Sequence, residues 1–232
     1  MYGYGYRYNS GLVLGAGGGA PFANTYSLSF DGIDDYVDLP SSVDLGINNT
    51  ICAWVKRSDI TNLDSITGES SFSGQQNIYI SGSQRVYMKI GSFTTFWYNV
   101  RGFGILNQVD TWFHLAIVRS GNDATLYLNG SPTFVKSGWG TSITTKFDRI
   151  GAQSVTGNSP MFGNLDEIVA FDRVLTPTEI TSISAAPTDL SSLSPLGWWR
   201  FEEGMGTTAI DSGSGGNNGT LINGVAYSTN VP

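Results

Sequence analysis

Short runs of β-branched and aromatic residues, each closed by Gly, Asn, Asp or Ser, recur along most of the chain and limit what it can fold into. Runs of this length and composition are typical of β-strands bounded by turns. Thirty glycines among 232 residues agree with this, because glycine is unfavourable inside helices. We therefore predict an all-β protein. The expected strands are Ser27–Phe30, Tyr36–Leu39, Ile51–Lys56, Ile78–Ile80, Val86–Ile90, Phe96–Val100, Trp112–Arg119, Ala124–Leu128, Thr133–Lys136, Asp148–Gly151, Leu165–Phe171 and Trp198–Phe201.

Two local patterns are specific enough to place individual residues. In "ATLYLNGSPTFV", Asn129 and Gly130 separate two strand-like runs, and this pair favours the positive φ angles of a tight hairpin turn. In "TPTEITSISA", Thr176 is a candidate N-cap, Pro177 takes the first helical position and Glu179 completes a capping box. One short helix among a dozen strands, with no repeat of about 20 to 50 residues, predicts a two-sheet antiparallel sandwich.

Charge and composition argue against several classes of function. The formal net charge is −7 and the isoelectric point is near 4.5, with no cluster of Lys or Arg, so nucleic acid is not expected as a partner. No run approaches the roughly 18 apolar residues of a membrane span. Cys52 and His114 are the only residues of their types, which excludes internal disulfides, multi-histidine metal sites and most Ser/His/Asp arrangements. Both lie in strand patterns, where we expect buried structural side chains.

Residues 1–25 form a Gly/Tyr-rich segment of low complexity, which we interpret as an N-terminal assembly arm. In an extended conformation Tyr2, Tyr4, Tyr6 and Tyr8 would line one face, while the glycines between them allow close backbone approach. Ordering such a segment costs roughly 1 to 2 kcal/mol per residue in backbone entropy. A partner surface is therefore needed, and we predict that the arm contacts another subunit.

Four segments in order resemble the laminin-G-like branch of the concanavalin A-like jelly-roll superfamily. They are "YSLSFDGIDDYVDL", "ICAWVKRSD", "WFHLAIVRSGNDATLYLNG" and "FGNLDEIVAFDRVLTPTEI". The resemblance implies an all-β, antiparallel two-sheet jelly-roll sandwich over residues 26–186, with one short helix.

The segment 187–232 also resembles this family, but in a permuted order. "GWWRFEEGMGTTAIDSGSGGNNGTL" follows the "LDE" strand here, whereas in many relatives it precedes the "FDG" motif. The segment either completes the sandwich of its own chain or exchanges with a neighbouring subunit. The arrangement of arm, jelly roll and "WWRFEEG" tail is similar to that of tailed-phage virion proteins.

The resemblance implies a structural calcium ion between the "FDGIDDYVD" turn and the "NLDEI" strand, with Asp31, Asp34, Asp35, Asp166 and Glu167 as candidate ligands. Calcium takes six to eight oxygen ligands in a flexible shell. The alternative is that these are solvated turn carboxylates. A second acidic loop, "DSGSGGNNGT", offers Asp211, Asn217 and Asn218, but a plain Asx-turn loop is the preferred interpretation.

No residue is proposed as catalytic. Glycoside hydrolases need two carboxylates about 5 to 9.5 Å apart across the scissile bond. Glu202 and Glu203 are adjacent, so in a strand they point to opposite faces and cannot pair.

Aromatic residues in loop-like or edge segments are candidates for glycan or partner contact. They are Trp97, Tyr98 and Trp139, for which packing is preferred over sugar binding. Trp54, Trp112, Trp198 and Trp199 lie inside strand patterns and are predicted to belong to the core.

These observations favour a non-catalytic structural or adhesion protein. The first hypothesis is a phage virion component, such as a capsid decoration, fibre or tail appendage, located on the virion and in contact with copies of itself or other virion subunits. The alternative is a soluble, extracellular carbohydrate-binding lectin module that binds surface glycans. A glycoside hydrolase remnant is the least favoured class.

Overall fold

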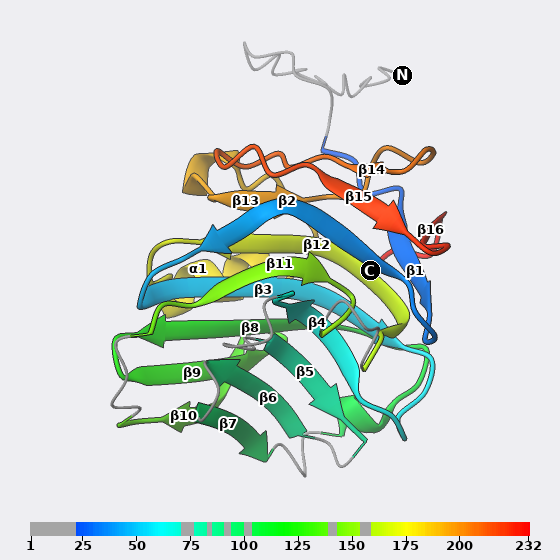
Figure 1. Cartoon of the computed structure of the whole chain (residues 1–232). Coiled ribbons are helices and arrows are strands. Elements are labelled where there is room, and N and C mark those ends of the chain that lie inside the picture. The colour runs from blue at the N-terminus through cyan, green and yellow to red at the C-terminus, as the bar shows by residue number, and fades with distance from the viewer. Residues whose placement is uncertain are drawn as a thin grey trace, which may run out of the picture.

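Two antiparallel sheets packed face to face make up the fold (Figure 1). The computed structural model describes residues 22–70, 77–82, 85–90, 94–99, 104–138, 143–153 and 159–232. The first sheet runs in the order β10-β9-β8-β3-β12-β1-β16, and β13 pairs with β12 beyond β1. Its strands are β10 (Ser131–Lys136), β9 (Asp123–Leu128), β8 (Trp112–Ser120), β3 (Asn48–Arg57), β12 (Phe162–Phe171), β1 (Ser27–Asp31), β16 (Ala226–Ser228) and β13 (Gly197–Trp199).

The second sheet runs in the order β14-β15-β2-β11-β4-β5-β6-β7 and faces the viewer in Figure 1. Its strands are β14 (Thr208–Ala209), β15 (Gly219–Ile222), β2 (Tyr36–Asp44), β11 (Lys146–Ile150), β4 (Asp64–Gly68), β5 (Asn77–Ser81), β6 (Arg85–Ile90) and β7 (Thr94–Asn99). The sheet order confirms the predicted two-sheet antiparallel sandwich.

Buried apolar residues alternate with outward-facing residues along the strands, and the buried ones form the core between the two sheets. Leu28 and Phe30 of β1 and Ile78 and Ile80 of β5 are buried in one cluster, while the residues between them point outward. This period of two is what a sheet with one buried face requires. The Asn129–Gly130 pair has φ angles of 46° and 75° and joins β9 to β10, which confirms the predicted hairpin.

Helix α1 (Pro177–Ile183) covers part of the outer face of the first sheet. Its Ile180 and Ile183 are buried in a second apolar cluster, which includes Val169 and Phe171 of β12. Two short 3-10 turns are also present, η1 (Ile105–Asn107) and η2 (Ser191–Leu193). No helix in the described part of the chain is long and apolar enough to span a membrane.

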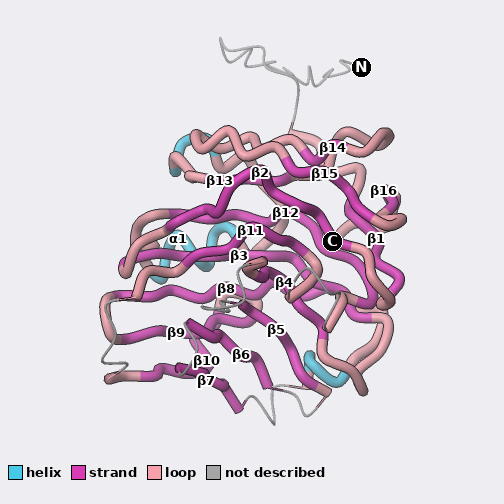
Figure 2. Tube along the Cα trace, viewed as in Figure 1, coloured by secondary structure: helices cyan, strands magenta, loops and turns pink. Residues whose placement is uncertain are grey.

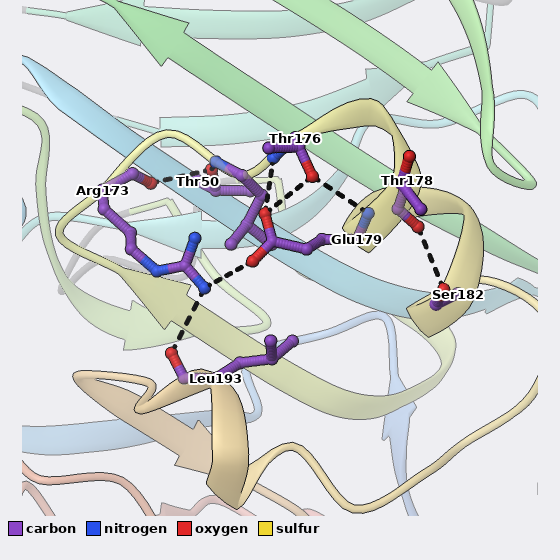
Figure 3. Close-up of polar contacts among 8 residues, drawn as sticks. Thr50, Arg173, Thr176, Thr178, Glu179, Ser182 and Leu193 are labelled. Carbon is purple, nitrogen blue, oxygen red and sulfur yellow. Dashed lines mark hydrogen bonds and ion pairs between the residues drawn. The ribbon is translucent and has the colours of Figure 1, made fainter.

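The start of α1 is fixed by the predicted capping box. The Thr176 side chain accepts a hydrogen bond from the backbone N–H of Glu179, and Glu179 accepts one from the backbone N–H of Thr176 at 2.7 Å. Arg173 donates to Glu179 at 2.8 Å and to the carbonyl oxygen of Leu193 (Figure 3). The hydrogen bond from Arg173 lowers the pKa of the Glu179 carboxyl to about 2. These contacts confirm the helix and tie it to the segment that follows.

The C-terminal segment joins both sheets of its own chain. β13 pairs with β12 and β16 pairs with β1 in the first sheet, while β15 pairs with β2 in the second. Within the single chain the segment thus completes both sheets, and exchange with a neighbouring subunit stays a prediction. The predicted arm residues Tyr2, Tyr4, Tyr6 and Tyr8 lie outside the described residues.

Four strands were missed by the sequence analysis, namely β4 and the short strands β14, β15 and β16. β4 reads "DSITG", and its aspartate and glycine hide the strand pattern. One predicted strand was too long, because β13 ends at Trp199. Phe201 has a φ angle of 60°, which a regular strand does not accommodate.

A buried ion pair joins the two sheets across the core. Arg57 of β3 donates through Nε to Asp64 of β4, and both side chains are fully buried. Arg57 also donates to the carbonyl oxygen of Asn62, and Asp64 accepts from the backbone N–H of Phe162 at the start of β12. Burial raises the pKa of Asp64, and the charge of Arg57 opposes this shift. The pair and its hydrogen bonds therefore connect β3, β4 and β12 at one position.

Replacing one partner of this pair should strongly destabilise the fold. We expect Arg57→Met to lower the free energy of unfolding by about 3 to 5 kcal/mol, because it leaves the Asp64 carboxylate buried without a counter-charge. Urea unfolding followed by tryptophan fluorescence measures the loss. The control is the double variant Arg57→Met with Asp64→Leu, which should recover most of it. Equal losses in the single and double variants would contradict this account.

Candidate functional site

The outer face of the second sheet is the broad surface that the described chain leaves open. α1 and residues 184–196 lie on the other sheet, where they cover an apolar cluster. In Figure 2 the strands β2, β11, β4, β5 and β6 lie across the front of the molecule. Outward positions on these strands are therefore the first place to look for a binding surface.

Strand alternation selects which side chains line this surface. On β6, Val86, Met88 and Ile90 are buried in the core, so Arg85, Tyr87 and Lys89 take the outward positions and are half-buried. On β5 the same rule places Tyr79 outward between two buried isoleucines. These four outward residues of β5 and β6 form what we call the β5–β6 strip.

Tyr79 and Tyr87 form a parallel aromatic pair at the centre of the β5–β6 strip. They are register partners on neighbouring strands, with ring centroids 4.6 Å apart and planes within 3° of parallel. Burial raises the pKa of the Tyr79 hydroxyl, with a further contribution from Tyr87. Ser65 is the register partner of Tyr79 on β4, and its buried Oγ has no hydrogen-bond partner within the described residues. The pair thus has an apolar body and polar ends.

The other half of the face contains a charged arrangement around Arg149 of β11. Its guanidinium lies 4.2 Å from the ring centre of Tyr36 and 3.2 Å from the Asp38 carboxylate. Asp148 lies 3.9 Å away and accepts hydrogen bonds from Ser70. Positive and negative charges are paired in this half, which we call the β2–β11 half.

The predicted contact residues only partly coincide with this face. Trp97 and Tyr98 are in β7, in register with Tyr87 and Val86 respectively, and Trp139 lies outside the described residues. The sequence analysis missed Tyr79, Tyr87 and Arg149. The alternation in "NIYIS" and "RVYMKI" is a signal that could have identified the two tyrosines.

The four tryptophans predicted to be in the core divide into two pairs. Trp198 and Trp199 are buried, as predicted. Trp54 and Trp112 are only half-buried. Trp54 is the register partner of His114 and packs edge-on against it at 5.3 Å, on the outer face of the first sheet. The prediction was therefore wrong for the second pair, because both faces of a strand can carry aromatic residues.

Three of the predicted calcium ligands lie where β1 ends: Asp31 is its last residue, and Asp34 and Asp35 are in the turn to β2. Asp35 is buried, accepts from the backbone N–H of Asp31 at 2.8 Å, and has its pKa raised to about 6 by burial. Asp31 also accepts from the backbone N–H of Ile33, and Asp34 is exposed. The Asp31 and Asp35 carboxylates therefore hold the backbone of the turn.

The other two predicted ligands, Asp166 and Glu167, lie in a bulge of β12. The β3 register shifts between Asp166 and Val169, and Glu167 has a φ angle of 47°. Such a bulge re-aims side chains. Both carboxyls are buried, and burial raises the pKa of Asp166 to about 8 and that of Glu167 to about 7. Two raised carboxyl pKa values next to a residue with positive φ mark a site where the fold holds two acid groups close to each other.

The five predicted calcium ligands do not converge on one position. Asp31 pairs with Phe162, four residues before Asp166 on β12, which separates the two groups by about 13 Å at strand spacing. Within the described residues no group of three or more His, Cys, Asp or Glu side chains is placed to hold a metal ion. The five residues thus lie in two groups in the described chain, and calcium binding by them stays a prediction.

Asp166 and Glu167 instead anchor the segment that follows the N-terminal residues. Asp166 accepts from the side-chain amide of Asn24 at 3.0 Å, and Glu167 accepts from the indole N–H of Trp198 and from Arg200. Glu202 accepts from the backbone N–H groups of residues 25 and 26. An open pocket of about 480 Å³ borders this network beside Trp198, Arg200 and Glu202. We call these carboxyls and their donors the carboxyl clasp.

The two glutamates considered for catalysis have structural partners, whereas the buried Nδ1 of His114 has no hydrogen-bond partner within the described residues. His114 is buried, which lowers its pKa to about 3. Glu202 bonds the chain at residues 25 and 26, whereas Glu203 accepts from the backbone N–H of Ile210 and the hydroxyl of Tyr227. The two glutamates thus bond different neighbours, but they lie in a turn after β13 and not in the strand from which their opposite orientations were predicted. Cys52 is buried, and burial raises its thiol pKa.

The second acidic loop, around Asp211, is an Asx-turn loop, which was the preferred interpretation of its sequence. Asp211 accepts from the backbone N–H groups of Trp198, Gly213 and Asn217, and its own N–H donates to the side chain of Asn218. Its carboxylate is thereby committed to the backbone.

The raised carboxyl pKa values predict that folding stability falls as pH rises. Between the unfolded values of 3.8 and 4.5 and the folded values of about 8 and 7, the native state holds more protons, so deprotonation costs stability throughout this window. The Asp166→Asn side chain does not titrate, so the stability of this variant relative to wild type should rise by roughly 4 kcal/mol between pH 5 and pH 8, at about 1.4 kcal/mol per pH unit. Urea midpoints at each pH measure the difference. Asp189→Asn, at an exposed carboxyl of the same pocket, is the control and should show no such gain.

Several solved structures share this fold at low sequence identity. A candidate carbohydrate-binding protein from Bacteroides ovatus has a TM-score of 0.66 and 16% identity, covering 90% of this chain and 60% of that one. The chain thus spans 60% of the length of that protein. A heptameric SAP-like pentraxin from Limulus polyphemus has a TM-score of 0.55 and 15% identity over 69% of this chain and 82% of its own.

Domains LG4-5 of the mouse laminin α1 chain have a TM-score of 0.50 and 12% identity, covering 65% of this chain and 44% of theirs. No curated protein matches the sequence. The sequence profile of the Laminin_G_3 family matches residues 31–181, which is more than half of the chain. With the two antiparallel sheets in place, this match means that the chain belongs to the concanavalin A-like lectin/glucanases superfamily.

Proposed function

We propose that this protein is a non-catalytic carbohydrate-binding module whose binding surface is the outer face of the second sheet. The observation that carries the proposal is the parallel pair of Tyr79 and Tyr87 on that face. A sugar ring has apolar C–H faces and polar edges, which match an aromatic body with a hydroxyl at its end. The Bacteroides ovatus protein, a candidate carbohydrate-binding protein, supports this at the level of the fold.

The surroundings of the tyrosine pair suit an extended ligand. Strands β4 to β7 run side by side, so a glycan chain can lie across several outward positions. Binding sites combine apolar area with a few polar groups that fix orientation. Here Arg85 and Lys89 flank Tyr87 on β6 and supply those polar groups.

Absence of catalysis is part of the proposal. Hydrolysis of a glycosidic bond needs two carboxyl groups on either side of it. On the described open face the carboxylates near Arg149 are engaged, since Asp38 pairs with Arg149 and Asp148 holds Ser70. The buried acids of the carboxyl clasp hold the chain on the other sheet.

This proposal adopts the alternative of the sequence analysis and gives an extracellular location, where glycans are the ligands. The virion hypothesis depended on the N-terminal arm, which lies outside the described residues, and the similar structures named above do not support it. Glycan binding depends only on described residues of the second sheet.

Removal of one ring should weaken binding without unfolding the protein. We expect Tyr87→Ala to weaken binding to a responsive polysaccharide by about tenfold or more, because a stacked aromatic contributes on the order of 1 kcal/mol beyond its buried area. Affinity gel electrophoresis against a panel of soluble plant, bacterial and marine polysaccharides measures the shift.

The matched control is Trp112→Ala, at a half-buried aromatic of the opposite sheet that bonds Asn230. It should leave binding unchanged. Release of reducing ends from any responsive polysaccharide would contradict the non-catalytic part of the proposal, and retention of full affinity by Tyr87→Ala would contradict the site.

A further inference from the structure

An open pocket lies at one end of the sandwich, on the right in Figure 1, where the β1–β2 turn, the loop between β3 and β4 and the residues just before β12 meet. Its volume is about 460 Å³, within the range of roughly 300 to 1,000 Å³ for sites that take small ligands. We call this space the end pocket. Its described lining residues include Gly32, Thr61, Asn62, Leu63, Ser159 and Phe162, and they are separate from the β5–β6 strip and from the carboxyl clasp.

The apolar wall of the end pocket is formed by Phe162 and Leu63. Phe162 is the first residue of β12 and is 37% exposed, and Leu63 is 41% exposed. The Phe162 side chain also packs on Gly32, because a Cβ atom at position 32 would lie 2.8 Å from the Phe162 Cβ and 3.0 Å from its Cγ. The φ angle of 78° at Gly32 is one that glycine adopts at little cost. The turn therefore supports an aromatic ring whose exposed surface lines the pocket.

The polar wall comes from the loop between β3 and β4. Asp59 accepts from the backbone N–H of Thr61 at 2.7 Å and from the side-chain amide of Asn62 at 2.9 Å. The second bond uses the amide nitrogen and leaves the Asn62 Oδ1 as an acceptor for a ligand. The carbonyl oxygen of Asn62 accepts from Arg57 at 3.1 Å, which holds the backbone of the loop as well. Together with the hydroxyl groups of Thr61 and Ser159, the Asn62 amide is thus positioned before any ligand binds.

The charged groups around the end pocket are mainly acidic. Hydrogen bonds from Thr61 lower the pKa of Asp59, so its carboxylate is charged at neutral pH. Asp31 is exposed at the start of the β1–β2 turn. In the described chain Arg57 is the one cation bonded to a lining residue, and its charge is already paired with Asp64 in the core. The local charge therefore disfavours an anionic ligand.

From these observations we infer that the end pocket binds a neutral mono- or disaccharide unit, at a site separate from the tyrosine pair. The Phe162 ring offers a platform for the C–H face of a sugar, and the Asn62 amide and the two hydroxyl groups can bond the polar edge of that sugar. The nearby carboxylates disfavour uronic acids. The inference rests on the proposed function, because it takes the ligand to be a carbohydrate, but it does not depend on Tyr79 or Tyr87.

Titration of the full chain with small sugars, followed through its backbone amide signals in two-dimensional NMR, tests the inference. The probes are glucose, galactose, N-acetylglucosamine, cellobiose and lactose, with glucuronic acid and galacturonic acid as the anionic counterparts of the first two. We expect at least one neutral sugar to shift the amide signals of Gly32, Asn62 and Phe162. The acid counterparts should bind about twofold more weakly or less, with a difference that narrows as salt increases.

Substitutions in the pocket should weaken binding of the responsive sugar. We expect a loss of about tenfold for Phe162→Ala, which removes the platform. Asn62→Ala should cost about three- to tenfold, and it keeps the backbone carbonyl that accepts from Arg57. Ile33→Ala is the matched control, because Ile33 is 71% exposed in the same turn and is not a lining residue, so binding should not change. Thermal melting identifies any variant that is unfolded, and Asn62→Ala tests the site if Phe162→Ala does not fold.

The outcomes separate this inference from the proposed function. Weaker binding of small sugars in Phe162→Ala and Asn62→Ala, with Tyr87→Ala unaffected, supports the end pocket. Amide shifts confined to β5 and β6, or no small-sugar binding while a polysaccharide still binds through Tyr87, overturn the end pocket and leave the proposed function standing. Equal binding of neutral and acid sugars overturns the selection by charge. Absence of binding to every sugar and polysaccharide overturns both proposals.

Discussion

The ion pair between Arg57 and Asp64 is the contact on which the open face depends. It crosses the core from β3 of the first sheet to β4 of the second, and Asp64 also accepts from the backbone at the start of β12. β5, β6 and β7 follow β4 in the sheet order, so the β5–β6 strip extends from a strand held by this pair. A buried pair adds little net stability over an apolar alternative, but it penalises any register that separates its partners. It therefore fixes where the second half of the sheet begins.

The bulge in β12 imposes a second constraint at the opposite side of the molecule. Positive φ at Glu167 allows two successive carboxyls to serve one side of the strand, where Asn24, Trp198 and Arg200 meet them. The bulge costs stability through strain and through buried acid groups. In return, Asn24 near the start of the described chain and the segment around Trp198 and Arg200 are both tied to β12.

Features decided by residues close together in the sequence were predicted, whereas features that depend on contacts between distant residues were not. The Asn129–Gly130 turn and the Thr176 capping box are decided within a few residues, and both were predicted correctly. β4 was missed because Asp64 is acceptable in a buried strand only through Arg57, which pairs with it in space. The offset of Asp31 from Asp166 depends on strand register, which the motifs do not contain, so the sequence could not show that these candidate calcium ligands lie in two groups. The tyrosine pair likewise exists only once β5 and β6 are paired.

The outward side chains of the two sheets differ in polarity, and this difference decides which outer face can stay exposed to water and bind a ligand. Outward positions on the first sheet include Val118, Val169 and Phe171, which form an apolar cluster and require the cover that α1 and Leu190 supply. Outward positions of β5 and β6 are tyrosines and cations, which are stable at a wet surface because each has a polar end. The second sheet can therefore stay uncovered without exposing an apolar patch. A surface that is stable in water and still offers aromatic rings is suited to a ligand that is itself mostly polar, such as a polysaccharide.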